Sequence, residues 1–365
     1  MTDRGSQIVQ ILDEKIQQAA TMSISYADFI ETVLYHQEHG YYRKTSTKIG
    51  TSGDFYTSSS VHPVFAWVFA EYFYKYLSEN NPPYSICEIG GGNGSFAKEV
   101  LTYLKVTYPE FLIDLNYFYI DVSEDHLVKA QQELASFSCV SFFNSWEGVT
   151  QPFHGIVFSN ELIDAFPVHV IEEDEGDIFE VRVTLDSTGK LIEKLVPLNN
   201  PMISEWLDWS GLALTEGQRL EAPLEMLDWI EQMSEFIDTG LLITVDYGYW
   251  DKDWQEPSHR RGSLRGYKNH QLIENPLLNA GQMDLTTHIH LDALLRKGEK
   301  VGFRSISSTR QREFLLNNGL FNFLHEHQNP DPFSKESRLN RAIRSFATPG
   351  GISDSFHVIV QEKRG

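Results

Sequence analysis

The chain has 365 residues, of which 41% are hydrophobic and 13% aromatic, enough to bury the core of one large α/β domain with additions or of two domains. Its 30 Lys and Arg residues against 51 Asp and Glu residues give a formal charge of −21, which repels a phosphate backbone and argues against nucleic acid as a partner. The same charge either attracts a basic protein segment or serves only solubility.

The first eighty residues have mainly helical patterns, with a loop in the middle. Ser25 and Asp28 have the spacing of a capping box, and Gly40 suits a helix end. Apolar residues recur from position 64 to position 77 with the 3.6-residue period of an amphipathic helix. Residues 1–80 are therefore predicted to form a helical cap.

Strands and helices alternate after this cap, at a spacing typical of a parallel doubly wound sheet. Strands are predicted at 84–89, 115–121, 140–144 and 155–160, and helices at 95–108, 123–135 and, briefly, at 161–166. The alternation stops between about residues 169 and 237, where residues 181–198 have the pattern of a β-hairpin and two helical patterns follow. We interpret this interruption as an insertion.

Three further strands, beginning near residues 241, 302 and 356, bring the predicted sheet to seven mostly parallel strands. The predicted fold class is thus α/β, with an N-terminal helical cap and an inserted lobe of hairpin and helices. In chain order, the predicted divisions are the cap at 1–80, the first part of the core at 81–168, the inserted lobe at 169–238 and the second part of the core at 239–365.

The glycine-rich segment ICEIGGGNGS, residues 86–95, lies where the first strand of the sheet turns into a helix. Glycines at such a turn let a ligand approach the backbone closely. Two nucleotide patterns fit: G-x-G-x-x-A of dinucleotide folds, through Gly92, Gly94 and Ala97, and E-x-G-x-G-x-G of methyltransferases, through Glu88, Gly90, Gly92 and Gly94.

The acid at Glu88 separates the two patterns. A dinucleotide pyrophosphate needs the positive end of a helix and no acid nearby. S-adenosyl-L-methionine has no phosphate and carries a positive amino group and a positive sulfonium, so Glu88 favours it. Asp121, at the end of the second strand, can bind ribose hydroxyls in either nucleotide, because Ser123 is the better cap for the next helix.

Two more acids, Glu161 and Asp164, follow the fourth strand and lie three residues apart on a short helix, which places them on one face. Ligands of open α/β sheets bind at this edge. Asn160 closes the strand and can hydrogen-bond a cofactor or a substrate. Trp146 follows the third strand, where it either stacks on adenine or belongs to the core.

The segment SNELIDAFPV, residues 159–168, resembles the N-E-x-x-D-A-x-P-V segment of the MidA family, methyltransferases whose mitochondrial members assist complex I assembly by methylating an arginine of a partner subunit. Segments 39–65, 87–95, 119–134, 245–249, 262–270 and 281–294 are similar to the family's other segments in order and spacing. The chain departs from the family at Val64 to Trp67, where a glycine-containing turn is frequent, and at Asp121, where Glu is common.

The resemblance implies a Rossmann-like class I methyltransferase with S-adenosyl-L-methionine as cofactor and an arginine of a protein partner as acceptor. A guanidinium needs carboxylates to bind it and to stabilise shifting charge, which gives Glu161 and Asp164 the catalytic roles. The resemblance also implies that Asp54 and Thr57 cover the cofactor. His270, Asp284 and Thr286 either line the substrate channel or have structural roles.

Several observations limit the partners further. His288 and His290 have a two-residue spacing without a clear third ligand, which argues against a metal site. Cys87 and Cys139 lie in apolar runs and fit free buried thiols in a reducing compartment. The N-terminus resembles neither a signal peptide nor a transit peptide, and no stretch suits a membrane span, so a cytoplasmic protein that binds no membrane is predicted.

Three alternatives remain at this point. The chain could be a methyltransferase of a small molecule, a cofactor-binding assembly factor without essential catalysis, or a dehydrogenase. NAD binding would identify the dehydrogenase, and the need for Glu161 in turnover would separate an enzyme from an assembly factor.

Overall fold

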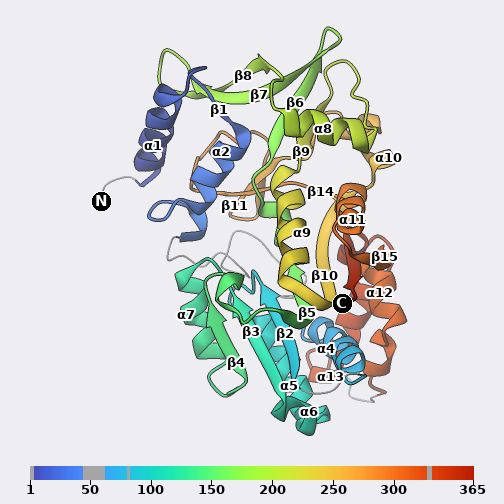
Figure 1. The fold of residues 1–365 in the computed structure, drawn as a ribbon. Coiled ribbons are helices and arrows are strands. Elements are labelled where there is room, and N and C mark those ends of the chain that lie inside the picture. The colour runs from blue at the N-terminus through green and yellow to red at the C-terminus, as the bar shows by residue number, and fades with distance from the viewer. Residues whose placement is uncertain (1–3, 44–61, 80–82, 327–330) are drawn as a thin grey trace.

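A mixed sheet of eight strands is the centre of the molecule (Figure 1). The structure, a computed structural model, describes residues 4–43, 62–79, 83–326 and 331–365. The strand order is β15-β16-β10-β5-β2-β3-β4, with β14 paired to β10. The bounds are β2 Tyr84–Ile89, β3 Leu115–Ile120, β4 Val140–Phe143, β5 Phe153–Asn160, β10 Ile237–Tyr249, β14 Ile289–His290, β15 Arg304–Arg310 and β16 Phe356–Lys363.

The predicted α/β class is confirmed, but a sheet of seven mostly parallel strands is only partly right. β4, β3, β2, β5 and β10 are parallel, whereas β16 runs antiparallel to both β10 and β15. The eighth strand, β14, has two residues and pairs in parallel with the end of β10. A two-residue strand is too short for any alternation of apolar and polar residues to reveal it.

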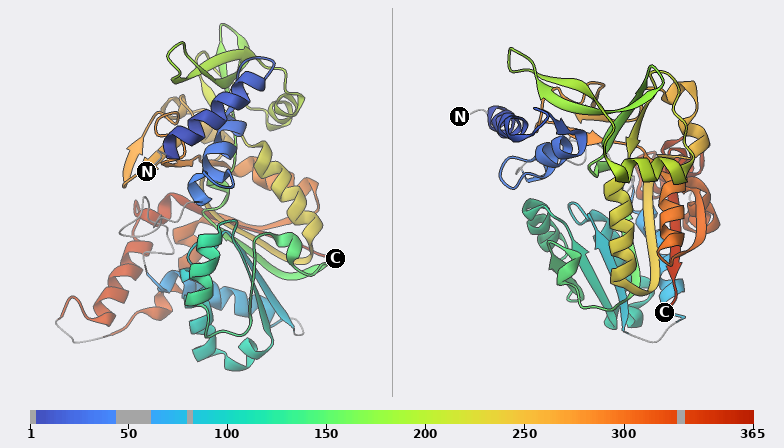
Figure 2. Two further views of the ribbon diagram at one scale, coloured as in Figure 1. Left: turned by 90° about the vertical axis from the view of Figure 1, so that its left-hand side faces the viewer. Right: turned by 45° about the horizontal axis from the view of Figure 1, so that its top comes forward.

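Helices cover both faces of this sheet. α4 (Val64–Leu77), α5 (Ser95–Thr107), α12 (Gln311–Asn317) and α13 (Lys335–Ala347) bury their apolar side chains in one hydrophobic core. α9 (Leu224–Phe236) and α11 (Leu291–Lys300) lie on the other face and form a second core (Figure 2). β5 and β10 are therefore buried on both faces, which explains their unbroken apolar runs at 156–158 and 241–243.

A second sheet lies beyond the carboxyl ends of the parallel strands (Figure 1). It contains β6 (His169–Asp174), β7 (Asp177–Leu185), β8 (Leu191–Pro197) and β9 (Arg219–Ala222), with α8 (Pro201–Ser210) between β8 and β9. β7 and β8 are the hairpin expected within residues 181–198. A small sheet of β11 (Arg265–Lys268), β12 (Gln271–Ile273) and β13 (Asp284–Thr286) lies nearby.

The described part of the first eighty residues divides between two hydrophobic cores. α1 (Arg4–Gln18), α2 (Tyr26–Ile30) and the π-helix η1 (Glu31–Tyr35) pack with the second sheet, and β1 (Ile24–Ser25) pairs with β7. α4 packs instead on the central sheet. The predicted capping box of Ser25 and Asp28 is present at the start of α2. We call residues 4–43 the N-terminal segment; this segment lies above the edge of the central sheet at which the parallel strands end (Figure 2).

The remaining short elements connect these layers. They are the 3-10 turns η2 (Tyr41–Arg43), η3 (Trp146–Gly148), η4 (Ile163–Ala165), η5 (Pro257–His259), η6 (Leu320–Phe323) and η7 (Ile352–Asp354), and the helices α6 (Pro109–Ile113), α7 (Glu124–Glu133) and α10 (Asp251–Trp254). The short helix expected at 161–166 is the single turn η4.

Candidate active site

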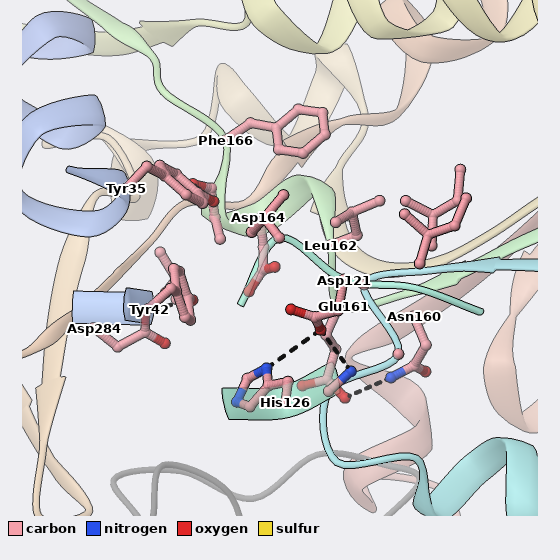
Figure 3. Close-up of a pocket in the computed structure, with 18 of the residues that line it drawn as sticks. Tyr35, Tyr42, Asp121, His126, Asn160, Glu161, Leu162, Asp164, Phe166 and Asp284 are labelled. Carbon is pink, nitrogen blue, oxygen red and sulfur yellow. Dashed lines mark hydrogen bonds and ion pairs between the residues drawn. The ribbon is translucent and has the colours of Figure 1, made fainter. Parts of the chain in front are cut away.

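A cavity of about 1040 Å³ lies between the central sheet and the N-terminal segment (Figure 3). It opens at the carboxyl ends of β2, β3, β5 and β10, where open α/β sheets bind their ligands. Its volume is slightly above the usual range for small-molecule sites, roughly 300–1,000 Å³. The predicted site residues that line it are Glu88, Gly90, Gly92, Asp121, Trp146, Asn160, Glu161, Asp164, His270, Asp284 and Thr286.

The glycine-rich turn after β2 is tightly wound. Gly90, Gly92 and Gly94 have φ angles of 76°, 66° and 80°, in the left-handed region that favours glycine. A Cβ at Gly91 would lie 2.3 Å from the ring of Tyr119, so the backbone here has no space for a side chain. Gly94 is absent from the cavity wall; a Cβ there would lie 3.0 Å from Ala130 of α7, so Gly94 serves the packing of α5 against α7.

Glu88 is a buried acid at the floor of the cavity. Its side chain accepts a hydrogen bond from the hydroxyl of Tyr117 at 2.8 Å. Burial raises the pKa of Glu88 to about 8, although the bond from Tyr117 opposes this shift. A positive group beside Glu88 would restore the ionised carboxylate. The residue thus suits a cationic cofactor, as the sequence argument proposed.

Asp121 is more occupied than the sequence suggested. One carboxylate oxygen accepts the N–H of Gly92 at 2.9 Å and lies 3.2 Å from Nδ1 of His126; the other accepts the N–H of Ser123 at 2.8 Å. Ser123 does cap α7, but this does not free Asp121 from a structural role. A carboxylate has about four lone-pair positions, so room for a ribose hydroxyl remains beside these three contacts.

The two predicted catalytic acids lie on a turn that follows β5. Glu161 has a φ angle of 52°, which is a strained backbone conformation for any residue other than glycine. Its N–H donates to the carbonyl of Val245 at 2.9 Å, which ties the turn to the neighbouring strand β10. We call residues 161–165 the acidic turn. Strain of this kind persists where the surrounding structure enforces it and is frequent in functional sites.

β10 holds the acidic turn through two consecutive residues. Asp246 is 1% exposed, and one of its oxygens accepts the backbone N–H groups of Ile163 and Asp164 at 3.0 and 3.1 Å. The hydroxyl of Tyr247 donates to Oδ2 of Asp164. The backbone of the turn is therefore fixed by Asp246, and its acid by Tyr247.

One carboxylate oxygen of Asp164 has no hydrogen-bond partner among the described residues. That oxygen is Oδ1, and the residue is 6% exposed. Burial raises the pKa of Asp164 to about 6, and the bond from Tyr247 opposes this shift. Burial, with Asp164 and Glu161 nearby, also raises the pKa of Asp246. A cationic donor facing Oδ1 would satisfy an otherwise costly buried group.

The other predicted residues take various positions. Asn160 donates to Glu161 at 3.2 Å, and Trp146 lies half-buried in the cavity wall. His270, Asp284 and Thr286 also line the cavity; Asp284 and Thr286 belong to β13, and His270 lies in the turn before β12. Asp54 and Thr57 lie outside the described residues.

The two histidines considered for a metal have other contacts. The ring of His288 stacks on Tyr249 at 4.2 Å, and His290 stacks on Trp254 while its Nε2 lies 2.7 Å from the carbonyl of Glu221. Among the residues that the structure describes, no group of three or more potential ligands could hold a metal ion.

Sequence reasoning missed several residues that complete the cavity. Tyr35, Tyr42 and Arg43 reach it from the N-terminal segment, and Tyr247 from β10. Asp246 lies behind the cavity wall, where it accepts a backbone N–H group of the acidic turn. Tyr42, Arg43, Asp246 and Tyr247 lie in segments 39–65 and 245–249 of the family resemblance. That resemblance was the only feature of the sequence that pointed to them.

The fold and the cavity together are typical of nucleoside-binding α/β enzymes. The turn after β2 has no room for a side chain at Gly91, a buried acid lies beside it, and a second acid follows β3. These features fit the amino group, the sulfonium and the ribose of S-adenosyl-L-methionine.

The sequence model of a family described as S-adenosyl-L-methionine-dependent methyltransferases matches residues 68–309, more than half of the chain. The chain belongs to this family. Its cofactor is S-adenosyl-L-methionine.

One curated protein is similar to this chain in sequence, and two solved structures are similar to it in fold. "Protein arginine methyltransferase NDUFAF7 homolog, mitochondrial" of Drosophila melanogaster is 25% identical over an alignment of 302 positions that covers 74% of this chain. The chain spans 65% of that relative's length. A Burkholderia thailandensis protein solved with S-adenosyl-homocysteine is 22% identical, with a TM-score of 0.89 over 99% of this chain and 92% of the other. A native crystal structure from the same organism gives 22% identity and a TM-score of 0.85 over the same shares. These two likenesses show the fold.

No helix within the described residues has the length and apolar character needed to cross a membrane.

Asp121 provides a test of the cofactor site. We expect Asp121→Ala to weaken S-adenosyl-homocysteine binding by about 1.5–3 kcal/mol, the range for a hydrogen bond to a charged group. Isothermal titration of both proteins measures this. Asp125→Ala, in the first turn of α7 and ion-paired with Lys129, is the matched control. An unchanged affinity in the Asp121 variant would remove this acid from the cofactor.

Proposed function

We propose that this chain methylates an arginine side chain of a partner protein. The observation that carries the proposal is the buried Oδ1 of Asp164, which lacks a donor within the described residues and belongs to a residue of the cavity wall. A guanidinium offers five N–H donors and a permanent positive charge, so it satisfies such an oxygen better than a neutral group does. The name of the Drosophila relative supports this acceptor.

The charge of the cavity supports a cationic acceptor as well. Seven carboxyl groups and two arginines occur among the described residues that line it. The carboxyl groups are Glu31, Glu88, Asp121, Glu161, Asp164, Glu225 and Asp284, and the arginines are Arg43 and Arg265. A net charge of −21 on the whole chain would likewise attract a basic segment of a partner and repel nucleic acid.

The chemistry asks two things of the protein. When bound, S-adenosyl-L-methionine supplies the methyl group: the S–C bond breaks with its electron pair returning to sulfur, an N–C bond forms on the guanidinium, and that nitrogen loses a proton. Asp164 and Glu161 bind the guanidinium through its N–H groups and draw its charge away from the attacking nitrogen. The free oxygen of Asp164 then accepts the proton.

The protonation state of Asp164 predicts how the rate of methyl transfer depends on pH. Because only the ionised carboxylate binds the cation and accepts the proton, methyl transfer should fall as the pH drops through about 6, the pKa of Asp164. The bond from Tyr247 lowers this pKa, so Tyr247→Phe should raise it and move the acidic limb to higher pH. A pH–rate profile between pH 5 and 9 measures the shift. Tyr74→Phe, in α4, is the control, and a Tyr247→Phe limb at the wild-type position would contradict the assignment.

The acceptor class is tested with an extract of cells that lack this protein. The extract is separated into macromolecules and small molecules, and each fraction receives the purified enzyme and methyl-labelled S-adenosyl-L-methionine. We expect label in the protein fraction, recovered as methylarginine after acid hydrolysis. Label only in the small-molecule fraction would favour a small-molecule methyltransferase, and no transfer to either fraction would favour an assembly factor; both results reject the proposal.

A further inference from the structure

Two tyrosines of the N-terminal segment form the wall of the cavity that faces the glycine-rich turn after β2. Tyr35 ends the π-helix η1, and Tyr42 lies in the 3-10 turn that follows. The hydroxyl of Tyr35 donates to the carbonyl of Ala165 in the acidic turn at 2.9 Å, and that of Tyr42 donates to Oδ1 of Asp284 at 2.7 Å. Each ring is thus held by a hydrogen bond at its far end. Short π-helical turns occur frequently at functional sites.

The two rings lie together beside the buried acids. Their centroids are 5.4 Å apart, with 35° between their planes. Figure 3 shows both side chains extending from the N-terminal segment toward Asp164, with Asp284 beside Tyr42. Asp284 is 3% exposed and comes from the edge strand β13. The wall therefore joins two aromatic faces to carboxylates from two other parts of the chain.

The phenols remain neutral at physiological pH. Burial, followed by the negative charge of Asp284, raises the pKa of both Tyr35 and Tyr42 well above the usual value. A neutral phenol ring has a negative face that attracts cations. The wall offers this face next to carboxylates, where a desolvated cation gains most.

We propose that Tyr35, Tyr42 and Asp284 form a subsite that binds the guanidinium of the acceptor against the tyrosine rings while Asp164 takes its N–H groups. This inference rests on the proposed function and adds the basis of its specificity. A guanidinium is flat, delocalised and weakly hydrated, so it packs against aromatic faces, whereas an ammonium is a compact and strongly hydrated charge. The subsite therefore selects arginine over lysine.

The test measures binding to the full chain saturated with S-adenosyl-homocysteine. The ligands are Nα-acetyl-arginine amide, Nα-acetyl-lysine amide and Nα-acetyl-citrulline amide, which has the shape of the arginine compound without its charge. Titration followed by NMR gives the affinities. We expect the wild type to bind the arginine compound at least about tenfold more tightly than the citrulline compound, as two aromatic contacts and a carboxylate would provide.

Three variants separate what the tyrosine rings, the tyrosine hydroxyls and the charge of Asp284 each contribute to arginine binding. Replacing both tyrosines by Leu should reduce arginine binding about tenfold and leave citrulline and S-adenosyl-homocysteine binding unchanged. Replacing both by Phe keeps the faces and should cost only a few-fold. Asp284→Asn keeps the shape and should reduce arginine binding alone, and it provides the test if the Leu variant does not fold. Tyr74→Leu in α4 is the matched control.

Equal affinity of the wild type for the arginine and citrulline compounds would overturn the subsite. An arginine preference that survives both the Leu and the Asn substitutions would overturn it too. Neither result would reject the proposed function, because the proposed function is tested separately by the recovery of label as methylarginine.

Discussion

Glu161→Gln and Asp164→Asn should each lower methyl transfer at least about 100-fold, the usual cost of removing one group that stabilises transition-state charge. S-adenosyl-homocysteine affinity should change little. The acidic turn follows β5, whereas Glu88, Gly92 and Asp121 belong to β2, β3 and the turns after them. The two functions are thus on different strands and should separate.

Amide substitutions isolate the charge because they keep the shape of the side chains. A guanidinium is a poor nucleophile, since its lone pairs are delocalised, and only interactions that strengthen in the transition state raise turnover. Single-turnover rates on the acceptor, together with titration of S-adenosyl-homocysteine, measure both quantities. Asp238→Asn, at the opposite end of β10 and half-exposed, is the matched control. Wild-type rates in both amide variants would make these acids structural and direct attention to Asp284 and His270.

Asp246→Ala should reduce turnover by a similar factor although Asp246 lies behind the acidic turn. Its two oxygens accept three backbone N–H groups, those of Ile163, Asp164 and Tyr247, at 2.9 to 3.1 Å. Alanine leaves these buried donors without an acceptor, so the turn shifts and Asp164 moves with it. A displacement of about 1 Å can cost roughly 100-fold in rate.

Asp246→Asn distinguishes positioning from general stability. The amide oxygen can still accept the N–H groups of Ile163 and Asp164, so we expect this variant to recover much of kcat. Turnover, S-adenosyl-homocysteine affinity and the thermal midpoint are measured for both variants. Asp246 is a positioning residue if kcat falls in Asp246→Ala at temperatures where the protein is fully folded. A wild-type kcat in that variant would show that the turn holds its shape without Asp246.

The cofactor half of the site could be predicted because its signal is local in sequence. The glycines after β2 and the acid after β3 belong to short segments whose strand and helix patterns are clear, and the predicted core elements occur within a few residues of their expected bounds. The acidic turn was found for the same reason, although it forms one 3-10 turn instead of a helix.

The part of the cavity that we propose for the acceptor depends on contacts between distant residues. Tyr42 meets Asp284 across 242 positions, Tyr35 meets Ala165 across 130, and Asp246 meets Asp164 across 82. Hydrophobic periodicity has no information on such pairs. The two-residue strand β1 likewise leaves no pattern, yet its pairing with β7 brings the N-terminal segment over the cavity.

Mass spectrometry that locates the transferred methyl group would test the central claim most directly. Cells without this protein receive either the wild type or Asp164→Asn and are supplied with isotopically labelled methionine, the precursor of the methyl donor. The account predicts at least one labelled arginine, modified on a guanidinium nitrogen, that occurs with the wild type and is lost with the variant. Wild-type-dependent label found only on lysine, on a carboxylate or on a small molecule, or arginine label equally abundant with the variant, would contradict it.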